Sequence, residues 1–186
     1  MRDAQDGNRA QERADPGAGG ADGAGNWDAL RTRQATRRDA NAVVELLSRM
    51  LQDMASYSDL GLIEPTRLGS QLLERFLGSF QRDDHVYLVA SMDKGRGGLV
   101  GVVEASVVSP SAVFRPRPLV HIYSLYVQPG YRGRGIGRGL LEEALGWGSA
   151  MGCAEAELSV LAGNPARKLY ERLGFGIFEL EMRRRL

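Results

Sequence analysis

An apolar strand pattern, a glycine-rich turn and a helix with one apolar stripe follow one another without a break between residues 119 and 152. The segment LVHIYSLYV is followed by QPGYRGRGIGRG, in which glycine and arginine replace the apolar residues. Glycine lets the backbone turn sharply and lets a ligand approach it closely, and arginine beside it suggests an anion. The helix behind the turn is marked by apolar residues at helical spacing and by a terminal glycine, namely Ile136, Leu140, Leu141, Ala144, Leu145, Met151 and Gly152. This order predicts a sheet that delivers a glycine-rich turn to a helix N-terminus.

Weaker patterns on both sides of this unit predict the rest of the sheet and its helices. Short strands are expected at LRTRQAT, VYLVAS, LVGVVEASVV and AEAELSV, and FGIFELEMRRRL is expected to close the chain as one or two strands. Helices are expected behind the capping pair Thr36 and Asp39, over residues 66–80, and at NPARKLYERLG. The resulting order is β-α-α-β-β-β-α-β-α-β, which predicts an α/β fold with a mixed sheet and helices on its faces.

The first 26 residues differ in composition from the rest of the chain. After Met1 they contain no Leu, Ile, Val or aromatic residue, so they cannot bury enough apolar surface to offset the entropy of ordering. We therefore expect a disordered tail over residues 1–26 and one domain over residues 27–186, beginning near Trp27.

Charge and composition argue against several classes of function. Lys and Arg together number 24 and Asp and Glu 23, so no overall charge favours nucleic acid as a partner. No apolar run approaches the roughly 20 residues that a membrane-spanning helix needs, so a membrane is not expected as a partner either. The single cysteine, Cys153, excludes an internal disulfide and fits a reducing compartment, which predicts a cytoplasmic protein.

The glycine-rich turn does not match the two common nucleotide-binding motifs. The dinucleotide fingerprint G-x-G-x-x-G fails because the sixth residue counted from Gly135 is Leu140. The P-loop fails because Ile136 and Gly137 stand where Lys and Ser or Thr belong. What remains is a run of backbone amides over residues 132–138 at a helix N-terminus, which favours an anion through free N–H groups and the helix dipole. A plain turn with solvated arginines is the alternative.

The turn does fit the pattern [RQ]-x-x-G-x-[GA], as RGRGIG, and NPARKLYERLGF follows it downstream. With the opening RQATRRDANAV and the order of elements, these motifs resemble the GNAT superfamily of acetyl-CoA-dependent N-acetyltransferases over residues 27–186. The resemblance implies acetyl-CoA as co-substrate and no metal. It also implies that the amides of residues 132–138 cradle the pyrophosphate of coenzyme A, and that the preceding strand splays from its neighbour to admit the pantetheine arm. An open sheet binds ligands beyond the carboxyl ends of its strands, which agrees with that placement.

The resemblance assigns one set of residues to the coenzyme. They are Leu125, Tyr126, Val127, Arg132, Gly133, Arg134, Gly135, Ile136, Gly137, Arg138 and Asn164. The contact of Asn164 stays open, because the residue already serves as the N-cap of its helix. It also stands two residues before Ala166, where many relatives have a spacing of three.

Acetyl transfer to an amine needs a base for the acceptor ammonium and an acid for the leaving thiolate. Tyr170 matches the tyrosine that the family places beside the coenzyme's sulfur, or it packs in the core with the apolar face of its helix. His121 stands where some relatives carry a glutamate or histidine base, or it is a half-buried histidine bonded to a carbonyl. Glu104, in the facing strand, is the second candidate base unless it pairs with an arginine. Water is the remaining alternative.

Together with these residues, the resemblance implies an N-acetyltransferase that acts on a primary amine by direct attack in a ternary complex. The acceptor is a small molecule, a peptide N-terminus or a lysine, and its identity, the use of other acyl groups and a homodimeric state stay open. Two alternatives remain: a non-catalytic module that binds acyl-CoA as a sensor or regulator, and an acetylase directed at tRNA or ribosomes. Asp53, Asp59 and Glu64 either attract a cationic amine or are solvated surface. His85 is expected at the solvent, since it follows two aspartates.

Overall fold

The computed structural model describes residues 30–57, 68–92, 98–109 and 117–184. The predicted tail and the predicted acidic positions Asp59 and Glu64 lie outside the described residues. In the described part of the chain, no helix is both apolar enough and long enough to cross a membrane.

One five-stranded sheet forms the centre of the fold, with its strands in the order β1-β2-β3-β4-β5. The strands are β1 (Arg31–Gln34), β2 (His85–Ser91), β3 (Leu99–Val108), β4 (Leu119–Val127) and β5 (Glu155–Leu158). The pairs β1–β2, β2–β3 and β3–β4 are antiparallel, whereas β5 runs parallel to β4. The sheet is therefore mixed, as the sequence predicts.

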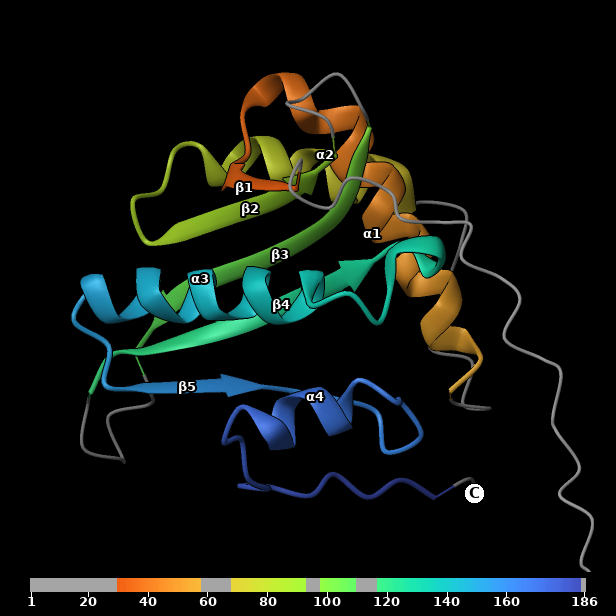
Figure 1. Ribbon diagram of the computed structural model, residues 1–186. Helices are drawn as coiled ribbons and strands as arrows, with labels where there is room; N and C mark the ends of the chain where they lie inside the picture. Colours follow the sequence, from red (N-terminus) through yellow and green to blue (C-terminus); the bar gives the residue numbers. More distant parts are fainter. Residues whose placement is uncertain (1–29, 58–67, 93–97, 110–116, 185–186) are drawn as a thin grey trace, which may run out of the picture.

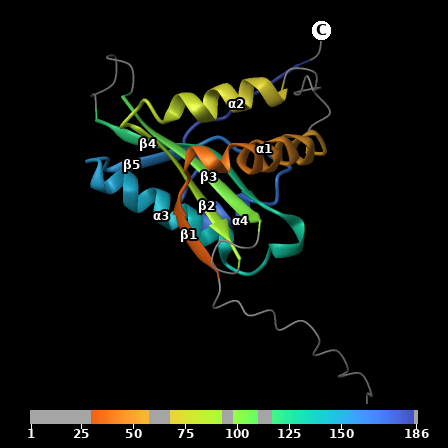
Figure 2. The same ribbon diagram turned by 90° about the horizontal axis from the view of Figure 1, so that it is seen from above.

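Helices cover both faces of this sheet (Figures 1 and 2). They are α1 (Ala40–Ala55), α2 (Leu68–Ser79), α3 (Ile136–Ala150) and α4 (Arg167–Arg172), with short 3-10 turns at Arg37–Asp39 and Pro129–Tyr131. Figure 2 shows α1 and α2 on one side of the strands and α3 on the other. The apolar stripe of α1, with Val43, Leu46 and Leu47 fully buried, faces one side of the sheet.

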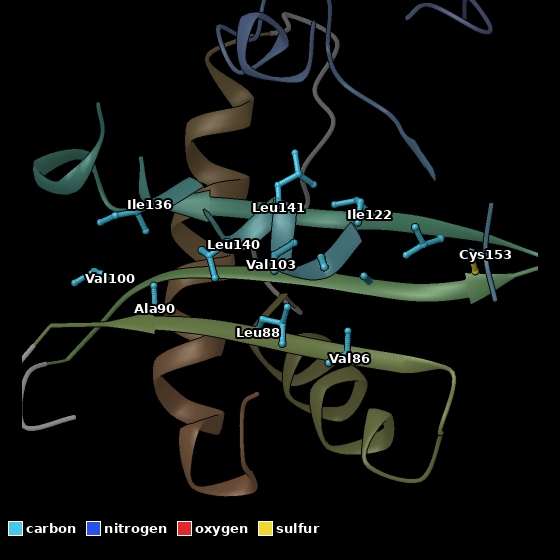
Figure 3. Close-up of a cluster of buried hydrophobic side chains, with 13 residues drawn as sticks. Val86, Leu88, Ala90, Val100, Val103, Ile122, Ile136, Leu140, Leu141 and Cys153 are labelled. Carbon is cyan, nitrogen blue, oxygen red and sulfur yellow. The ribbon is translucent and has the colours of Figure 1, made fainter. Parts of the chain in front are cut away.

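The core lies on both faces of the strands. Between the sheet and α3, one buried cluster includes Val103, Ile122, Leu140 and Leu141 (Figure 3). The second cluster, between the sheet and the pair α1 and α2, centres on Phe76. Alternate residues of β2, and of β3 from Val102 onward, enter opposite clusters, as the two-residue period of a strand requires. The bulge between Leu99 and Gly101 interrupts this alternation at the start of β3. Helix α3 comes very close to β4 at Gly148, where an added Cβ would stand 2.6 Å from Val120 Cβ.

The closing strands predicted for FGIFELEMRRRL are wrong over the described residues. No strand is formed at 175–184, and the apolar side chains after Phe175 are exposed, Phe178 at 94%. The alternation of apolar and charged residues is a local pattern, and it becomes a strand only where a neighbouring strand offers unpaired backbone groups. The outer strand β5 is only four residues long, which leaves a short edge for such pairing.

Candidate active site

Strands β4 and β5 run side by side for only four rungs and then part. Their pairs extend from Leu119 opposite Glu155 to Ile122 opposite Leu158. Beyond that rung, β4 continues over residues 123–127 without a pairing to β5. A bulge lies at the point of separation, because Glu104 of β3 pairs with Ser124 and its neighbour Ala105 pairs with Ile122, so that one residue of β4 is passed over. The splay implied by the resemblance is present.

A cavity of about 540 Å³ opens where the two strands part, between the end of β4, the turn before α3, α4 and α1. It is lined by Met50, Asp53, Met54, Tyr57, Leu125, Tyr126, Val127, Tyr131, Arg132, Gly133, Gly135, Ile136, Gly137, Arg138, Asn164, Pro165, Ala166, Leu169, Arg172 and Leu173. All of the residues that the resemblance assigns to the coenzyme belong to this lining except Arg134, which is exposed. The sequence motifs therefore converge on one cavity of the size that binds a small molecule or cofactor.

The turn before α3 presents backbone amides to this cavity. Gly133 and Gly135 adopt positive φ angles of 75° and 81°, which residues with a side chain rarely adopt, and Gly135 is the N-cap of α3. The first helical bond runs from Gly139 N to Gly135 O at 2.9 Å, so the amides of the first turn have no partner within the helix. Gly137 is the second residue of α3, and an added Cβ there would meet side-chain atoms of Val127 and Leu169 at 3.6 Å. The cradle is thus built for a ligand with negative charge.

Arg132 ties the turn to its surroundings. Its Nε donates to Val127 O at 2.8 Å and its Nη2 donates to Asp53 Oδ2 at 2.6 Å, which links the turn to both β4 and α1. The guanidinium also lies over the Tyr126 ring, 5.3 Å from its centroid. Asp53, one of the predicted acceptor-binding acids, is therefore already paired with a cation. Because Arg132 already donates to these partners, the donors that the turn leaves for a ligand in the cavity include the backbone amides at the start of α3.

The start of α4 borders the cavity from the other side. Asn164 lines the cavity, and its Oδ1 accepts from Ala166 N at 2.9 Å in the turn before the helix. The predicted N-cap position is wrong, because α4 begins at Arg167 with Ala166 as its N-cap. The helix ends at Arg172, and Gly174, whose φ is 89°, stands just past its end, as the sequence predicts. Phe175 N donates back to Tyr170 O at 3.0 Å, which closes the C-terminal turn.

Tyr170 lies on the inner side of α4. It packs against the cluster beneath α3, and its ring stands edge-on to Phe175 with 6.0 Å between centroids. Its neighbours Leu169 and Leu173 line the cavity, whereas Tyr170 itself does not belong to the lining. Burial raises the pKa of the Tyr170 phenol. A raised pKa keeps the hydroxyl protonated at neutral pH, which an acid requires and a nucleophile does not.

His121 stands on the rung of β4 opposite Glu157 of β5, one rung before the strands part. Its Nδ1 lies 2.8 Å from Glu157 Oε1, and its ring centroid lies 4.3 Å from that of Tyr123. The side chain is 23% exposed, so a proton on it can exchange with solvent. His121 lies beside the point of separation rather than in the lining of the cavity.

Glu104 is completely buried and is paired with an arginine, the alternative that the sequence left open. Arg75 of α2 donates through Nε to Oε1 at 2.6 Å, and Ser124 donates to Oε2 at 3.1 Å. His85 Nε2 lies 3.1 Å from Oε1. Burial alone would raise the pKa of Glu104, but the bonds from His85 and Arg75 outweigh it and hold the pKa below its usual value. A carboxylate held in this way is a poor proton acceptor.

The prediction that His85 lies at the solvent is wrong. Its side chain is only 7% exposed, because β2 begins at this residue and α2 packs over it. The ring stacks between Tyr87 and Tyr123, with centroid distances of 5.4 and 6.2 Å. The adjacent Asp84 is turned outward and pairs with Arg82. The aspartates next to His85 in the sequence therefore give no indication of its partner Glu104, which β3 supplies.

A second, smaller cavity of about 390 Å³ lies on the α2 face of the sheet. It is lined by Arg75, Gly78, Ser79, Arg82, His85 and Tyr123. Sequence reasoning singled out neither Arg75 nor Tyr123, and it did not single out Glu157. Arg75 holds its guanidinium 5.1 Å from the Tyr123 ring centroid. Tyr123 is thus shared by this cavity and by His121, and it connects the two regions around the bulge.

Comparisons with known proteins agree with this geometry. The sequence model of the acetyltransferase (GNAT) family matches residues 47–175, which is more than half of the chain. No curated protein matches the chain in sequence.

Solved structures share the fold at low sequence identity. The tetramutant of the BH1408 protein from Bacillus halodurans is 24% identical, with a TM-score of 0.69 over 84% of this chain and 99% of that chain. The aminoglycoside N-acetyltransferase AAC(6')-Iy in complex with CoA is 20% identical, with a TM-score of 0.67 over 84% of this chain and 94% of that chain. A predicted acetyltransferase with acetyl-CoA from Clostridium acetobutylicum is 19% identical, with a TM-score of 0.67 over 83% and 96%.

Proposed function

We propose a specific reaction for this chain, which belongs to the acetyltransferase (GNAT) family and is an acyltransferase. The reaction is transfer of an acetyl group from acetyl-CoA to a primary amine, on a small molecule, a peptide N-terminus or a lysine. The observation that carries the proposal is the cavity beside the point where β4 and β5 separate, which the turn before α3 borders with its unpaired amides. Two of the solved structures that share the fold are complexes with CoA or acetyl-CoA.

The cavity fits acetyl-CoA in its chemistry. The positive φ angles of Gly133 and Gly135 and the absence of a side chain at Gly137 keep the amides open to a diphosphate. The free edge of β4 at residues 123–127 leaves backbone donors and acceptors for an amide-bearing arm. Apolar side chains from α1 and α4, among them Met50, Met54 and Leu169, line the rest. Acetyl-CoA, when bound, supplies the activated acetyl thioester.

Two residues supply the proton transfers in this proposal. His121, partly exposed beside the point where the strands separate, accepts a proton from the acceptor ammonium, directly or through water. Tyr170, kept protonated by burial, donates a proton to the leaving thiolate. Glu104 is less suited to the base role, because it is fully buried and already accepts from Arg75 and Ser124. The amine attacks the thioester directly in a ternary complex, so no covalent acyl-enzyme is needed.

A screen for thiol release tests the proposal. The protein is incubated with acetyl-CoA and, in separate reactions, with small amines, peptides with free N-termini and lysine peptides. We expect release of free thiol that depends on one class of amine, together with an acetylated product of matching mass. Acetyl-CoA binding without turnover on any amine would contradict the proposal and favour the non-catalytic sensor.

A further inference from the structure

We propose that Glu157 is a positioning residue that orients His121 and fixes its tautomer for the proton transfer. This inference rests on the proposed function, since it assigns His121 the role of base. It adds a residue that neither the sequence motifs nor the family match singles out. It also gives a specific role to the carboxylate that β5 contributes beside the parting of the strands.

The pairing of β4 with β5 fixes the position of the two residues. His121 and Glu157 are direct partners on a parallel rung, and only the rung of Ile122 and Leu158 separates them from the parting of the strands. His121 Nδ1 and Glu157 Oε1 are 2.8 Å apart, the distance of a strong charge-assisted hydrogen bond. The contact joins residues 36 positions apart in the sequence and is set by the register of the sheet.

This contact selects one tautomer of the imidazole. An ionised carboxylate can only accept hydrogen bonds, so the proton of the neutral ring must sit on Nδ1. The lone pair is then on Nε2, which makes Nε2 the atom that can take a proton. No residue in the described ranges makes a hydrogen bond to Nε2. Glu157 thus leaves the basic nitrogen of His121 free and stabilises the imidazolium that forms when it accepts a proton.

The surroundings of His121 hold the ring in this orientation. Tyr123 lies against it at 4.3 Å, with the two rings inclined by 49°. Tyr123 in turn stacks with His85 of β2 and lies beneath the guanidinium of Arg75 of α2. Among the described residues, Glu157 therefore supplies the only carboxylate that bonds to His121.

If the pair of His121 and Glu157 only stabilised the fold, replacing Glu157 would have little effect on stability or activity. Glu157 is 47% exposed, and a solvent-exposed ion pair contributes about 0–1 kcal/mol to stability. Glu155 provides a matched control, because it is an exposed glutamate two residues earlier on β5 and stands opposite Leu119 rather than a histidine. Replacing either glutamate by glutamine removes the same charge from the same strand. Only Glu157→Gln removes the carboxylate beside His121.

Nuclear magnetic resonance of the imidazole nitrogens tests the tautomer directly. The chain has two histidines, so His121→Gln identifies the signals of His121 by their loss. At neutral pH we expect the neutral ring of His121 to carry its proton on Nδ1 in the wild-type protein and in Glu155→Gln. In Glu157→Gln we expect a mixture of tautomers, because an amide can either accept from Nδ1–H or donate to a bare Nδ1. A proton on Nε2 in the wild-type protein, or an unchanged tautomer in Glu157→Gln, would overturn the inference.

Kinetics then separate positioning from structure. We expect Glu157→Gln to lower kcat at least about 10-fold, up to the roughly 10²–10⁴-fold loss that removing a general base causes. We expect its KM for acetyl-CoA to stay unchanged, because Glu157 lies outside the lining of the coenzyme cavity. In the His121→Gln background, Glu157→Gln should cause no further loss, since the two residues act as one unit. Additive losses, or a loss equal to that of Glu155→Gln, would contradict the inference.

The two proposals can fail separately. If the wild-type protein acetylates no amine, the proposed function fails, and the tautomer measurement still decides whether Glu157 orients His121. If the wild-type protein is active and Glu157→Gln keeps its kcat and the tautomer of His121, the proposed function stands and the positioning role is wrong.

Discussion

The contact between α3 and β4 predicts opposite changes in stability when two glycines of α3, Gly146 and Gly148, are replaced by alanine. Gly148 faces Val120 so closely that an added Cβ would stand 2.6, 2.7 and 3.0 Å from its Cβ, Cγ1 and Cγ2. Gly146, in the same helix, has nothing within 4 Å of such a Cβ. Alanine is favoured over glycine in a helix interior by about 0.8–1.0 kcal/mol, so propensity alone predicts the same gain at both positions.

The clash at Gly148 should reverse that gain. Overpacking a filled core costs roughly 1–3 kcal/mol, and the atom that clashes most is Val120 Cβ, which cannot move without its strand. Less the propensity gain of about 1 kcal/mol, Gly148→Ala should lower the free energy of unfolding by up to about 2 kcal/mol. Gly146→Ala should raise it by up to about 1 kcal/mol.

Thermal and urea denaturation of the two variants measure these changes. A change of 1 kcal/mol moves Tm by roughly 2–4 °C in a domain of this size, so the two variants should lie on opposite sides of the wild-type Tm. If Gly148→Ala proves as stable as Gly146→Ala, the close approach of α3 to β4 is wrong.

Three further changes test other parts of the structure. Tyr170→Phe should lower kcat by roughly 10²–10⁴-fold with little change in acetyl-CoA affinity, because only the hydroxyl is lost, and an unchanged rate would return Tyr170 to a packing role. Glu104→Gln should lower the free energy of unfolding by about 2–3 kcal/mol, less than for a fully buried pair because Arg75 is 44% exposed. Since the folded pKa of Glu104 is lowered, its contribution is present above the unfolded pKa of about 4.3 and is lost as pH falls through the folded pKa. Wild-type stability should therefore fall more steeply below about pH 4.3 than that of Glu104→Gln, and parallel pH curves would contradict the network. A chain beginning at Trp27 should keep the Tm and acetyl-CoA affinity of the full chain, and loss of either would mean that residues 1–26 contribute to the fold or the site.

Local sequence patterns predicted most of the elements and the cavity. Three correct predictions each depend on residues within a single element. They are the strand VYLVAS, the apolar stripe of the helix behind the glycine-rich turn, and the end of that helix at Gly152, whose φ is 86°. The motif that suggested a coenzyme loop is itself local, since the same few residues form the turn and begin the helix. The residues of this motif, with the exception of Arg134, accordingly line one cavity.

The wrong or missing predictions all depend on partners that are distant in the sequence. His85 is buried because α2 and β3 supply Arg75 and Glu104, which its neighbours Asp83 and Asp84 do not indicate. The segment 175–184 alternates like a strand but forms no ladder, because pairing needs a partner strand. Glu157 meets His121 only through the register of β5 on β4, which no local pattern encodes.

The central claim is that the turn before α3 holds acetyl-CoA, and calorimetric titration of two matched variants tests it most directly. Gly137→Phe places a ring in the cavity at a helical position without a positive φ, where the first added atom meets its neighbours at 3.6 Å. Gly139→Phe adds the same ring two residues later, outside the lining and with nothing within 4 Å of its Cβ. We expect Gly137→Phe to lose at least about 100-fold in acetyl-CoA affinity, or about 2.7 kcal/mol, while Gly139→Phe binds like the wild-type protein and both keep the wild-type Tm. Unchanged affinity in a folded Gly137→Phe would contradict the claim and move the coenzyme away from this turn.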